Sequence, residues 1–457
     1  MSDQPNLVFV FPDEYRSQAV GAANQDPVIT PNLDAFAKES LVFTDAISNR
    51  PVCSPYRAML FSGKYPHKNG VYGNVNSSTV QYENYLKEDE RCFSDVLRDA
   101  GYSQGYIGKL HLDPPNDAAH FTEGPRGDGR VWDSYTPPGP RRHGFDFWHS
   151  YGCCDWHNQP HYWHGDARID QRIEVHEWST KHETDVAVDY IENKAGWRDP
   201  DKPFSLFVSY NPPHMPFNQV PQEYVDRYGD ATHEDLLLRP NVPKDDRGDR
   251  ARQDVKNYFA MVTGVDEAFG RILAALKAEG LKENTIVVFT SDHGEMMGSH
   301  GLMGKSVWYE ESMVIPLMIR WPEKIKPGTD DLLIGTADLT ASLLALTGQA
   351  DQIPLGMQGN NYAPAFLGET IERPTSALYI ESVPSWPEGG KRGVRTHQHT
   401  YVVERSKDGG DREILHDNQA DPYQMVNVAD DQREVAERLC VEMHGWLRET
   451  EDPWVLR

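Results

Sequence analysis

Short apolar runs alternate with amphipathic stretches along most of the chain. The runs lie at residues 7–11, 204–210 and 285–290, and each ends in a polar segment. Continuous apolar runs are typical of parallel strands that are covered on both faces. Residues 182–193 and 257–279 place apolar side chains at helical spacing. The alternation predicts an α/β fold with a large mixed, mostly parallel sheet sandwiched by helices.

A different pattern begins near residue 376. Short apolar segments recur at 378–380, 393–396, 399–403 and 413–415, and an amphipathic stretch follows at 434–448. Closely spaced short strands predict a small antiparallel sheet, and the last stretch predicts a helix that covers it. We therefore divide the chain into a large domain over residues 1–372 and a smaller C-terminal α+β subdomain over residues 373–457.

Residues 113–178 have a third texture, rich in proline, glycine, histidine and aromatic residues, with no clear period. This composition predicts long ordered loops packed over the sheet. Loops on a rigid scaffold commonly determine specificity. The aromatic side chains between Trp132 and Trp178 have polar neighbours and suit the face of a sugar ring, with ordinary loop packing as the alternative.

Composition narrows the class of protein. The chain has 457 residues, of which 38% are hydrophobic, as in ordinary globular proteins. Its 45 basic and 70 acidic residues give a formal net charge of −25, which argues against a nucleic-acid partner. Five cysteines, two of them adjacent, do not form a disulfide framework. Polar residues 1–5 and the lack of an apolar run of about 20 residues predict a cytoplasmic protein with no membrane partner.

Acidic residues follow two of the predicted strands directly. Asp13 and Glu14 come after the first apolar run, and Asp292 and His293 come after the third. Open α/β sheets bind ligands at the carboxyl ends of their strands, so these side chains can meet around one cation. For Asp13, a helix cap is the alternative.

Basic and imidazole groups lie at two further strand ends. Lys109 and His111 are spaced to point to the same side of an extended chain. His214 lies between prolines just after the second apolar run. These positions can present a cation and proton carriers to one ligand, whereas a solvated surface pair is the alternative for Lys109 and His111.

Cys53 begins the pattern Cys-x-Pro-x-Arg, which contains Pro55 and Arg57 and is followed by Gly63. If a helix starts near Pro55, the cysteine lies at its positive end. The N–H groups of the first turn and Arg57 can then bind an anion there. The alternative is a buried cysteine beside a turn.

The segment Cys53-Ser54-Pro55-Tyr56-Arg57, with Gly63, resembles the signature of the type I sulfatases within the alkaline phosphatase superfamily. Further segments that resemble the family follow in the family's order: Gly108-Lys109-Leu110-His111, Pro213-His214-Met215-Pro216, Ser291-Asp292-His293-Gly294 and Gly304-Lys305. The C-terminal segment is similar to the family's smaller subdomain, so the resemblance covers nearly the whole chain.

The resemblance implies a mechanism and a set of site residues. A formylglycine-generating enzyme would oxidise Cys53 to formylglycine, whose hydrate attacks the sulfur of a sulfate ester. One divalent cation is implied, calcium by family expectation, with magnesium or manganese as alternatives. The implied metal ligands are Asp13, Glu14, Cys53, Asp292 and His293. The implied catalytic residues are Cys53, Arg57, Lys109, His111, His214 and Lys305, and His214 is a candidate donor of a proton to the leaving alcohol.

Substrate contacts are expected from three further residues. Asn74 follows the helix after Cys53 and is similar to a family contact, with an ordinary turn asparagine as the alternative. Arg395 and His397 are expected to close the pocket from the C-terminal subdomain. Because a cytoplasmic enzyme meets small imported molecules, we predict an exo-acting carbohydrate sulfatase with a closed pocket. Its substrate would be a sulfated monosaccharide or a short oligosaccharide. The oligomeric state stays open, and a homo-oligomer is compatible with the sequence.

Two alternatives remain. His293 stands where many sulfatases have asparagine and where phosphonate and phosphodiester hydrolases of the superfamily often have histidine. The first alternative is therefore a phosphonate monoester or phosphodiester hydrolase with the same nucleophile. The second is an inactive homologue that only binds a ligand, and the nearly complete set of charged site residues argues against it.

Overall fold

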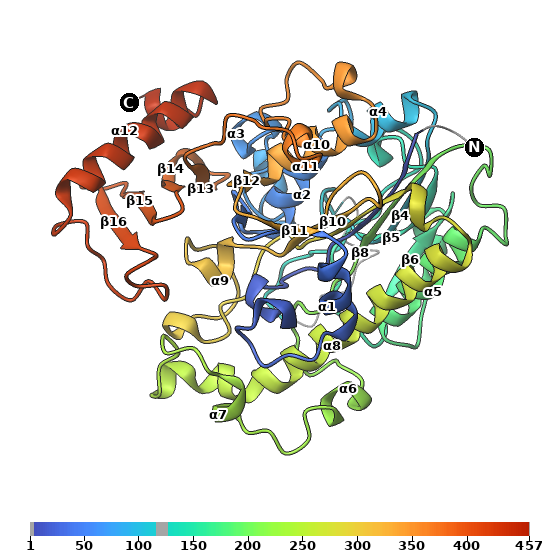
Figure 1. Cartoon of the computed structure of the whole chain (residues 1–457), viewed down its shortest axis with the longest axis horizontal. Helices are drawn as coiled ribbons and strands as arrows, with labels where there is room; N and C mark the ends of the chain where they lie inside the picture. Colours follow the sequence, from blue (N-terminus) through green and yellow to red (C-terminus); the bar gives the residue numbers. More distant parts are fainter. Residues whose placement is uncertain (1–3, 116–126, 457) are drawn as a thin grey trace.

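A mixed sheet of ten strands runs through the centre of the protein (Figure 1). The computed structural model describes residues 4–115 and 127–456. In their order across the sheet, the strands are β11 (Gly328–Asp330), β2 (Leu41–Phe43), β10 (Leu317–Arg320), β9 (Thr285–Phe289), β1 (Asn6–Val10), β8 (Phe204–Ser209), β4 (Ser103–Lys109), β5 (Phe147–Tyr151), β6 (His161–His164) and β7 (Ile173–Glu174).

Strand β1 lies inside the sheet and pairs in parallel with β8 and β9. Strands β4 and β5 continue the parallel part beyond β8, whereas β10, β6 and β7 run antiparallel to their neighbours. The predicted mixed, mostly parallel sheet is confirmed. Because parallel strands end at the same edge, the residues that follow β1, β4, β8 and β9 lie along one edge of the sheet.

Alternate residues of β1 enter two different cores. Leu7 and Phe9 belong to the core that includes α2 (Cys53–Ser62), α4 (Phe93–Asp99) and α10 (Thr336–Leu346). Val8 and Val10 belong to the core that includes α1 (Pro31–Lys38), α5 (Ser179–Glu192) and α8 (Asp249–Ala278). The two groups of helices cover opposite faces of the sheet (Figure 1). Burial on both faces explains why the strand is apolar without interruption.

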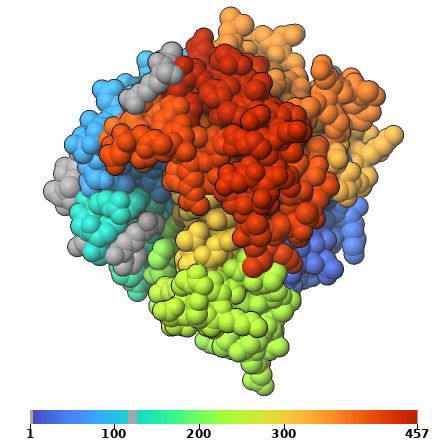
Figure 2. Space-filling view, turned by 90° about the vertical axis from the view of Figure 1, so that its left-hand side faces the viewer, coloured from blue at the N-terminus to red at the C-terminus, as the bar shows by residue number. Residues whose placement is uncertain are grey.

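The predicted C-terminal sheet and covering helix are confirmed. An antiparallel sheet contains β13 (Ala377–Val383), β14 (Trp386–Arg395), β15 (His399–Arg405) and β16 (Arg412–Asp417), and α12 (Arg433–Glu449) packs against it. The predicted boundary at residue 372 lies just before β13. Figure 2 shows this subdomain, in orange and red, against the yellow segment near residue 300.

Shorter elements connect the larger ones. They are the paired strands β3 (Ala46–Ile47) and β12 (Ile334–Gly335) and the helices α3 (Pro66–Asn69), α6 (Gln222–Asp226), α7 (His233–Leu236), α9 (Glu310–Met313) and α11 (Ala363–Phe366). The predicted long helix is confirmed as α8, but it begins at Asp249 and not at 257. Its first turns bury only Ala251 and Val255, so the apolar period is weak there.

The segment at 113–178 contains more regular structure than the predicted ordered loops. Strands β5, β6 and β7 lie within it and extend the main sheet. They have five, four and two residues, which is too short for a clear apolar period. Trp148 and Trp163 are buried in it, whereas Trp156 is 42% exposed. Residues 116–126 of the segment lie outside the described residues.

Two further features concern the chain as a whole. Within residues 4–115 and 127–456, every helix is too short or too polar to cross a bilayer. All five cysteines are free thiols.

Candidate active site

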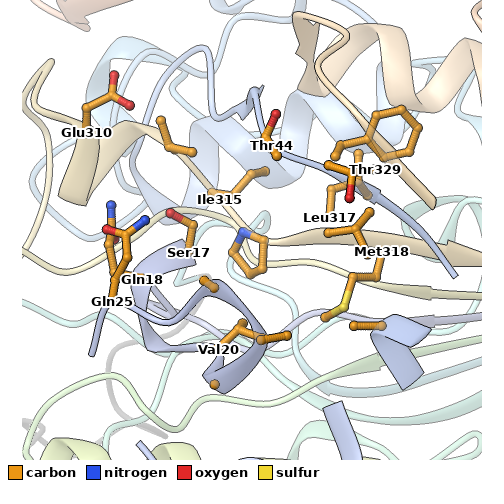
Figure 3. Close-up of a pocket in the computed structure, with 18 of the residues that line it drawn as sticks. Ser17, Gln18, Val20, Gln25, Thr44, Glu310, Ile315, Leu317, Met318 and Thr329 are labelled. Carbon is orange, nitrogen blue, oxygen red and sulfur yellow. The ribbon is translucent and has the colours of Figure 1, made fainter. Parts of the chain in front are cut away.

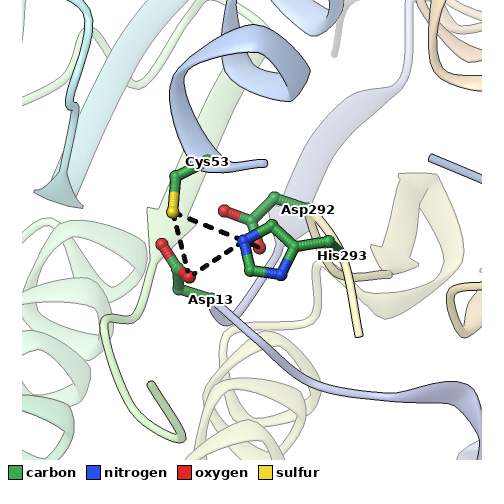
Figure 4. A group of neighbouring side chains, drawn as sticks. All are labelled: Asp13, Cys53, Asp292 and His293. Atoms are coloured by element: carbon green, nitrogen blue, oxygen red, sulfur yellow. Dashed lines mark hydrogen bonds and ion pairs between the residues drawn. The ribbon is translucent and has the colours of Figure 1, made fainter. Parts of the chain in front are cut away.

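Four side chains meet at the carboxyl edge of the main sheet (Figure 4). Asp13 follows β1, Asp292 and His293 follow β9, and Cys53 is the first residue of α2. The Sγ atom of Cys53 lies 3.5 Å from Asp13 Oδ1 and 3.3 Å from His293 Nε2. Each of the four residues is at most 1% exposed, so this four-residue cluster is buried.

The start of α2 fixes the position of Cys53. The preceding Val52 is extended, and Pro55 lies in the first turn, where its missing N–H group costs no helical hydrogen bond. The Ser54 N–H donates a 3.1 Å hydrogen bond to Asn74 Oδ1. Asn74, a predicted substrate residue, therefore contacts the backbone beside Cys53.

Arg57 lies beneath the cluster. Its guanidinium lies 3.1 Å from Asp292 Oδ2 and 3.2 Å from Asp13 Oδ2. It also donates hydrogen bonds of 2.6 Å to Ser209 Oγ and 2.7 Å to the Lys109 carbonyl. Arg57 thus fixes both carboxylates relative to the ends of β4 and β8, and these donors are not directed at an outer ligand.

Two lysines bring positive charge to Cys53. Lys109 Nζ lies 2.7 Å from Asp13 Oδ2, and Lys305 Nζ lies 3.2 Å from Glu14 Oε1. Burial alone would raise the pKa of the Cys53 thiol, but the two lysines and the neighbouring imidazole bring it well below its usual value. The surroundings therefore favour an anionic group at position 53.

The cluster has the donors of a divalent cation site. One ligand atom from each of Asp13, Cys53, Asp292 and His293 lies within 4.8 Å of all the others. Burial and the charge of Asp13 raise the pKa of Asp292 to about 6, although Arg57 lies close by. A cation among these atoms would offset the repulsion between two buried carboxylates. The carboxylate donors fit Ca²⁺, Mg²⁺ or Mn²⁺.

Glu14 lies beside the cluster, in a second group with Asp13 and His214. Its backbone is left-handed, with φ of 67°, and its N–H donates to Asp292 Oδ1 at 3.2 Å. Burial opposes ionisation of its carboxyl, but Lys305 and His214 lower its pKa to about 2. Glu14 is thus an anion placed between a lysine and an imidazole.

The two predicted histidines approach from different strands. His111 lies beside the Cys53 side chain, and its Nε2 is 3.0 Å from the Val75 carbonyl oxygen. His214 Nε2 lies 3.4 Å from Glu14 Oε2. The strand ends therefore bring the predicted metal ligands and catalytic residues into one buried region.

Arg395 and His397 lie elsewhere. The Arg395 guanidinium contacts Glu310 at 2.8 Å and Asp45 at 2.7 Å, and its residue is 5% exposed. Both residues line a cavity of about 1080 Å³ together with residues of β2 and β10. Figure 3 shows part of its lining, including Glu310, Leu317 and Met318. The lining of this cavity does not include Cys53 or its partners. The structure therefore does not place these two predicted substrate residues at the four-residue cluster.

Two residues that the sequence did not reveal connect the site. Asn211 Oδ1 accepts a 3.1 Å hydrogen bond from Lys109 Nζ, and Asn211 Nδ2 donates to Asp155 Oδ1 at 3.2 Å. Asp155 Oδ1 also lies 3.4 Å from His214 Nδ1. Asn211 follows β8 closely, so its position was a usable signal, whereas Asp155 lies in a loop and only the fold reveals its partners.

Comparisons with known proteins agree with this geometry. The Sulfatase family profile matches residues 5–349, and the profile for the C-terminal region of N-sulphoglucosamine sulphohydrolase matches residues 298–452. A Bacteroides thetaiotaomicron protein named Endo-4-O-sulfatase is 42% identical over 99% of this chain and 94% of its own length. A Formosa agariphila protein named Ulvan-active sulfatase is 36% identical over 93% of this chain and 77% of its own.

The fold of this chain also matches that of solved structures. A solved structure from Bacteroides fragilis, assigned to the sulfatases, is 41% identical and superposes with a TM-score of 0.94 over 99% of this chain and 97% of the other. The family profile spans the four-residue cluster and both lysines. The chain therefore belongs to the sulfatase family of the alkaline phosphatase superfamily and is a sulfuric ester hydrolase.

Proposed function

We propose that the protein removes sulfate from a sulfated sugar, with formylglycine derived from Cys53 as the nucleophile and one divalent cation beside it. The observation that carries this proposal is the buried cluster, in which a position that favours an anion meets two carboxylates. The names of the relatives, Endo-4-O-sulfatase and Ulvan-active sulfatase, support a carbohydrate substrate and suggest a 4-O-sulfate as the first ester to test.

The charged side chains would act on the sulfate group. A sulfate ester carries negative charge on its oxygens, and Lys109 and Lys305 place positive charge near position 53. Preorganised charges of this kind stabilise the transition state without having to reorient. Arg57 would hold the two carboxylates in place, and His214 would donate a proton to the leaving oxygen.

Asp13, Asp292 and His293 would hold the cation, with the group at position 53 as a further ligand and Glu14 close by. We propose calcium, with magnesium or manganese as the other options for this donor set. When bound, such a cation supplies Lewis-acid stabilisation of charge on the sulfate oxygens. Metal analysis of the purified protein, before and after treatment with a chelator, tests this assignment.

Conversion of Cys53 is tested by peptide mass spectrometry after co-expression with a formylglycine-generating enzyme. Oxidation of the thiol carbon to an aldehyde lowers the peptide mass by about 18 Da. The aldehyde content should rise in parallel with activity. Full activity in a preparation that contains only unmodified Cys53 would contradict the formylglycine mechanism.

A prediction and a relative's name bear on the size of the substrate, and they point in different directions. The predicted cytoplasmic location, which stays a proposal, favours a monosaccharide or short oligosaccharide. The relative named Endo-4-O-sulfatase favours internal units of a sugar chain. Buried aromatic residues such as Trp148 and Trp163 cannot contact a sugar. Trp156 is accessible, and Trp132 is half-buried with its ring 6.1 Å from that of His111, so these two are the candidate aromatic platforms in this segment.

A panel of substrates tests the proposal. It contains 4-O- and 6-O-sulfated amino sugars, sulfated disaccharides, a long sulfated polysaccharide and a simple aryl sulfate. Faster turnover of the short sugars supports action at a chain end, and efficient release from internal units of the polymer would contradict it. A strong preference for the aryl ester would contradict a carbohydrate substrate.

A phosphonate monoester or phosphodiester hydrolase is the second candidate, because His293 occupies the cluster where many sulfatases have asparagine. Turnover of a sulfate ester and a phosphodiester with the same leaving group separates the two functions. A large preference for the diester would overturn the sulfatase assignment of the physiological reaction. The remaining alternative is an inactive homologue that only binds a ligand. Hydrolysis by the wild type that is lost in Asp292→Ala would exclude this alternative, because the activity then depends on the site of this protein.

A further inference from the structure

A buried carboxylate lies on the side of His214 that faces away from Glu14. Asp155 Oδ1 is 3.4 Å from His214 Nδ1, and Glu14 Oε2 is 3.4 Å from His214 Nε2. We propose that Asp155 is a positioning residue, which orients the His214 imidazole so that Nε2 can deliver a proton to the leaving alcohol. The proposal rests on the proposed function, in which the leaving group is a sugar hydroxyl.

The contacts of the two ring nitrogens differ. Nδ1 faces two acceptors, the Met215 carbonyl oxygen at 2.8 Å and the Asp155 carboxylate. In the protonated ring, the Nδ1–H group therefore points to these acceptors. The Nε2–H group then points to the side where Glu14 and Asp13 lie. A ring flip would lose both contacts of Nδ1, so Asp155 and Met215 select one orientation.

Asp155 is itself held in place. The residue is 4% exposed, and its Oδ1 accepts a 3.2 Å hydrogen bond from Asn211 Nδ2. Its carbonyl oxygen accepts from Gln219 Nε2 at 3.2 Å. Because Asn211 also binds Lys109, the carboxylate connects the proton donor to a lysine of the site. Such a supporting shell is what keeps a reactive group within a small fraction of an ångström of its working position.

The role makes a prediction that depends on the leaving group. When the sulfur–oxygen bond breaks, its electron pair stays on the leaving oxygen, and the proton from Nε2 neutralises the alkoxide. A sugar alkoxide needs that proton, whereas a nitrophenolate is stable without it. Asp155→Asn should therefore lower kcat/KM about 100-fold for a sugar sulfate, a typical size for a lost acid–base contribution, and less than tenfold for 4-nitrophenyl sulfate.

The experiment compares four proteins on both esters: the wild type with oxidised Cys53, Asp155→Asn, His214→Ala and the double variant. His214→Ala should show the same dependence on the leaving group. The double variant should be no slower than His214→Ala on the sugar ester, because the proposed role of Asp155 is to orient that ring. Asp166→Asn is the control, since its side chain is 91% exposed, and it should leave both rates within twofold of the wild type.

Thermal unfolding identifies a variant that fails to fold. Asp155→Glu, which keeps the charge but moves it, then replaces Asp155→Asn, and the sugar ester should again lose more than the aryl ester. Equal losses on the two esters in a folded variant, no loss on either, or additive losses in the double variant would overturn the proposal. A wild type that hydrolyses neither ester would instead contradict the proposed function, so the two failures are distinguishable.

Discussion

Side chains from segments far apart in the sequence supply the charge around Cys53, and they differ in how firmly the fold holds them. Lys109 is completely buried and contacts Asp13. The Lys305 side chain is 15% exposed and reaches Glu14 from a loop. Replacement of Lys305 should therefore disturb the fold less than replacement of Lys109, which makes it the better probe of charge at the site.

We expect Lys305→Ala to lower kcat/KM for a sulfate ester about 100- to 1000-fold, because it removes a preorganised positive charge near the sulfate. Its melting temperature should change little. Lys324→Ala, at an exposed lysine, is the control and should keep the wild-type rate. Steady-state kinetics and thermal unfolding of both variants test the expectation. A loss smaller than threefold for Lys305→Ala would show that this lysine does not act on the reaction.

Strand β4 depends on a glycine just before Lys109. Gly108 has φ of 94°, and a Cβ atom there would lie 2.2 Å from the Ser209 carbonyl oxygen on β8. Gly101 also has a positive φ, 89°, but a Cβ atom there would meet open space. The pair separates the cost of the backbone conformation from the cost of the close approach between strands.

Gly108→Ala should lower the free energy of unfolding by about 3 kcal/mol or more, since a strained φ and a backbone clash add together. Gly101→Ala should cost only about 1 kcal/mol, which is the effect of the strained φ alone. Urea unfolding of both variants gives the two values. Similar losses would mean that β4 and β8 separate easily, and activity should then survive in Gly108→Ala.

Three histidines lie in a row between β5, β6 and α5. His149 Nδ1 is 3.1 Å from His164 Nδ1, and His149 Nε2 is 3.0 Å from His182 Nε2. Tyr162 stacks on the His149 ring at 4.3 Å, and Glu177 lies beyond His182. Burial holds the pKa of His149 well below its usual value, and the charges of His182 and His164 lower this pKa further.

This row makes stability depend on pH. The folded protein keeps His149 unprotonated, whereas the same imidazole in the unfolded chain has a pKa of about 6.5. Below that pH the unfolded state binds the extra proton, so the free energy of unfolding falls as the pH falls, by up to about 1.4 kcal/mol per pH unit. In His149→Gln, the part of this pH dependence that His149 causes should disappear. Urea unfolding of both proteins between pH 5 and 7.5 measures it, and parallel pH profiles would contradict the assignment.

One buried arginine connects the two parts of the protein. Arg395, at the end of β14, contacts Glu310 of α9 and Asp45 before β3. The C-terminal subdomain is therefore joined to the large domain by charge as well as by apolar packing. Removal of the arginine would leave two carboxylates without their partner in a largely buried place.

Arg395→Met should lower the free energy of unfolding by about 3–5 kcal/mol, as expected when one member of a buried ion pair is lost. Its KM should stay near the wild-type value, because Arg395 lies away from the four-residue cluster. Arg433→Ala is the control, since this arginine forms exposed ion pairs and its removal should leave the free energy of unfolding nearly unchanged. A raised KM with unchanged stability would restore Arg395 as a substrate residue.

The sequence predicted those strands and site residues that a local pattern of apolar and polar positions identifies. The apolar runs that became β1, β8 and β9 were long enough to identify, and the polar residues after them had to share one edge of the sheet. Asp155 and Asn211 were missed as partners because their contacts join loops that no periodicity describes. Arg395 was expected near the substrate because the sequence does not show its ion pair with Asp45. The two residues are 350 positions apart in the chain.

If Cys53 is oxidised as we propose, its burial also sets the order of events when the protein is made. In the folded chain Cys53 is 1% exposed and is enclosed by Asp13, Asp292 and His293, which come from distant segments of the large domain. An oxidising enzyme could not bind the segment around Cys53 once α2 has packed against the sheet. Under the proposed mechanism, maturation would then happen on the nascent or still unfolded chain, and a protein purified in the thiol form would need to be denatured, oxidised and refolded before it could work.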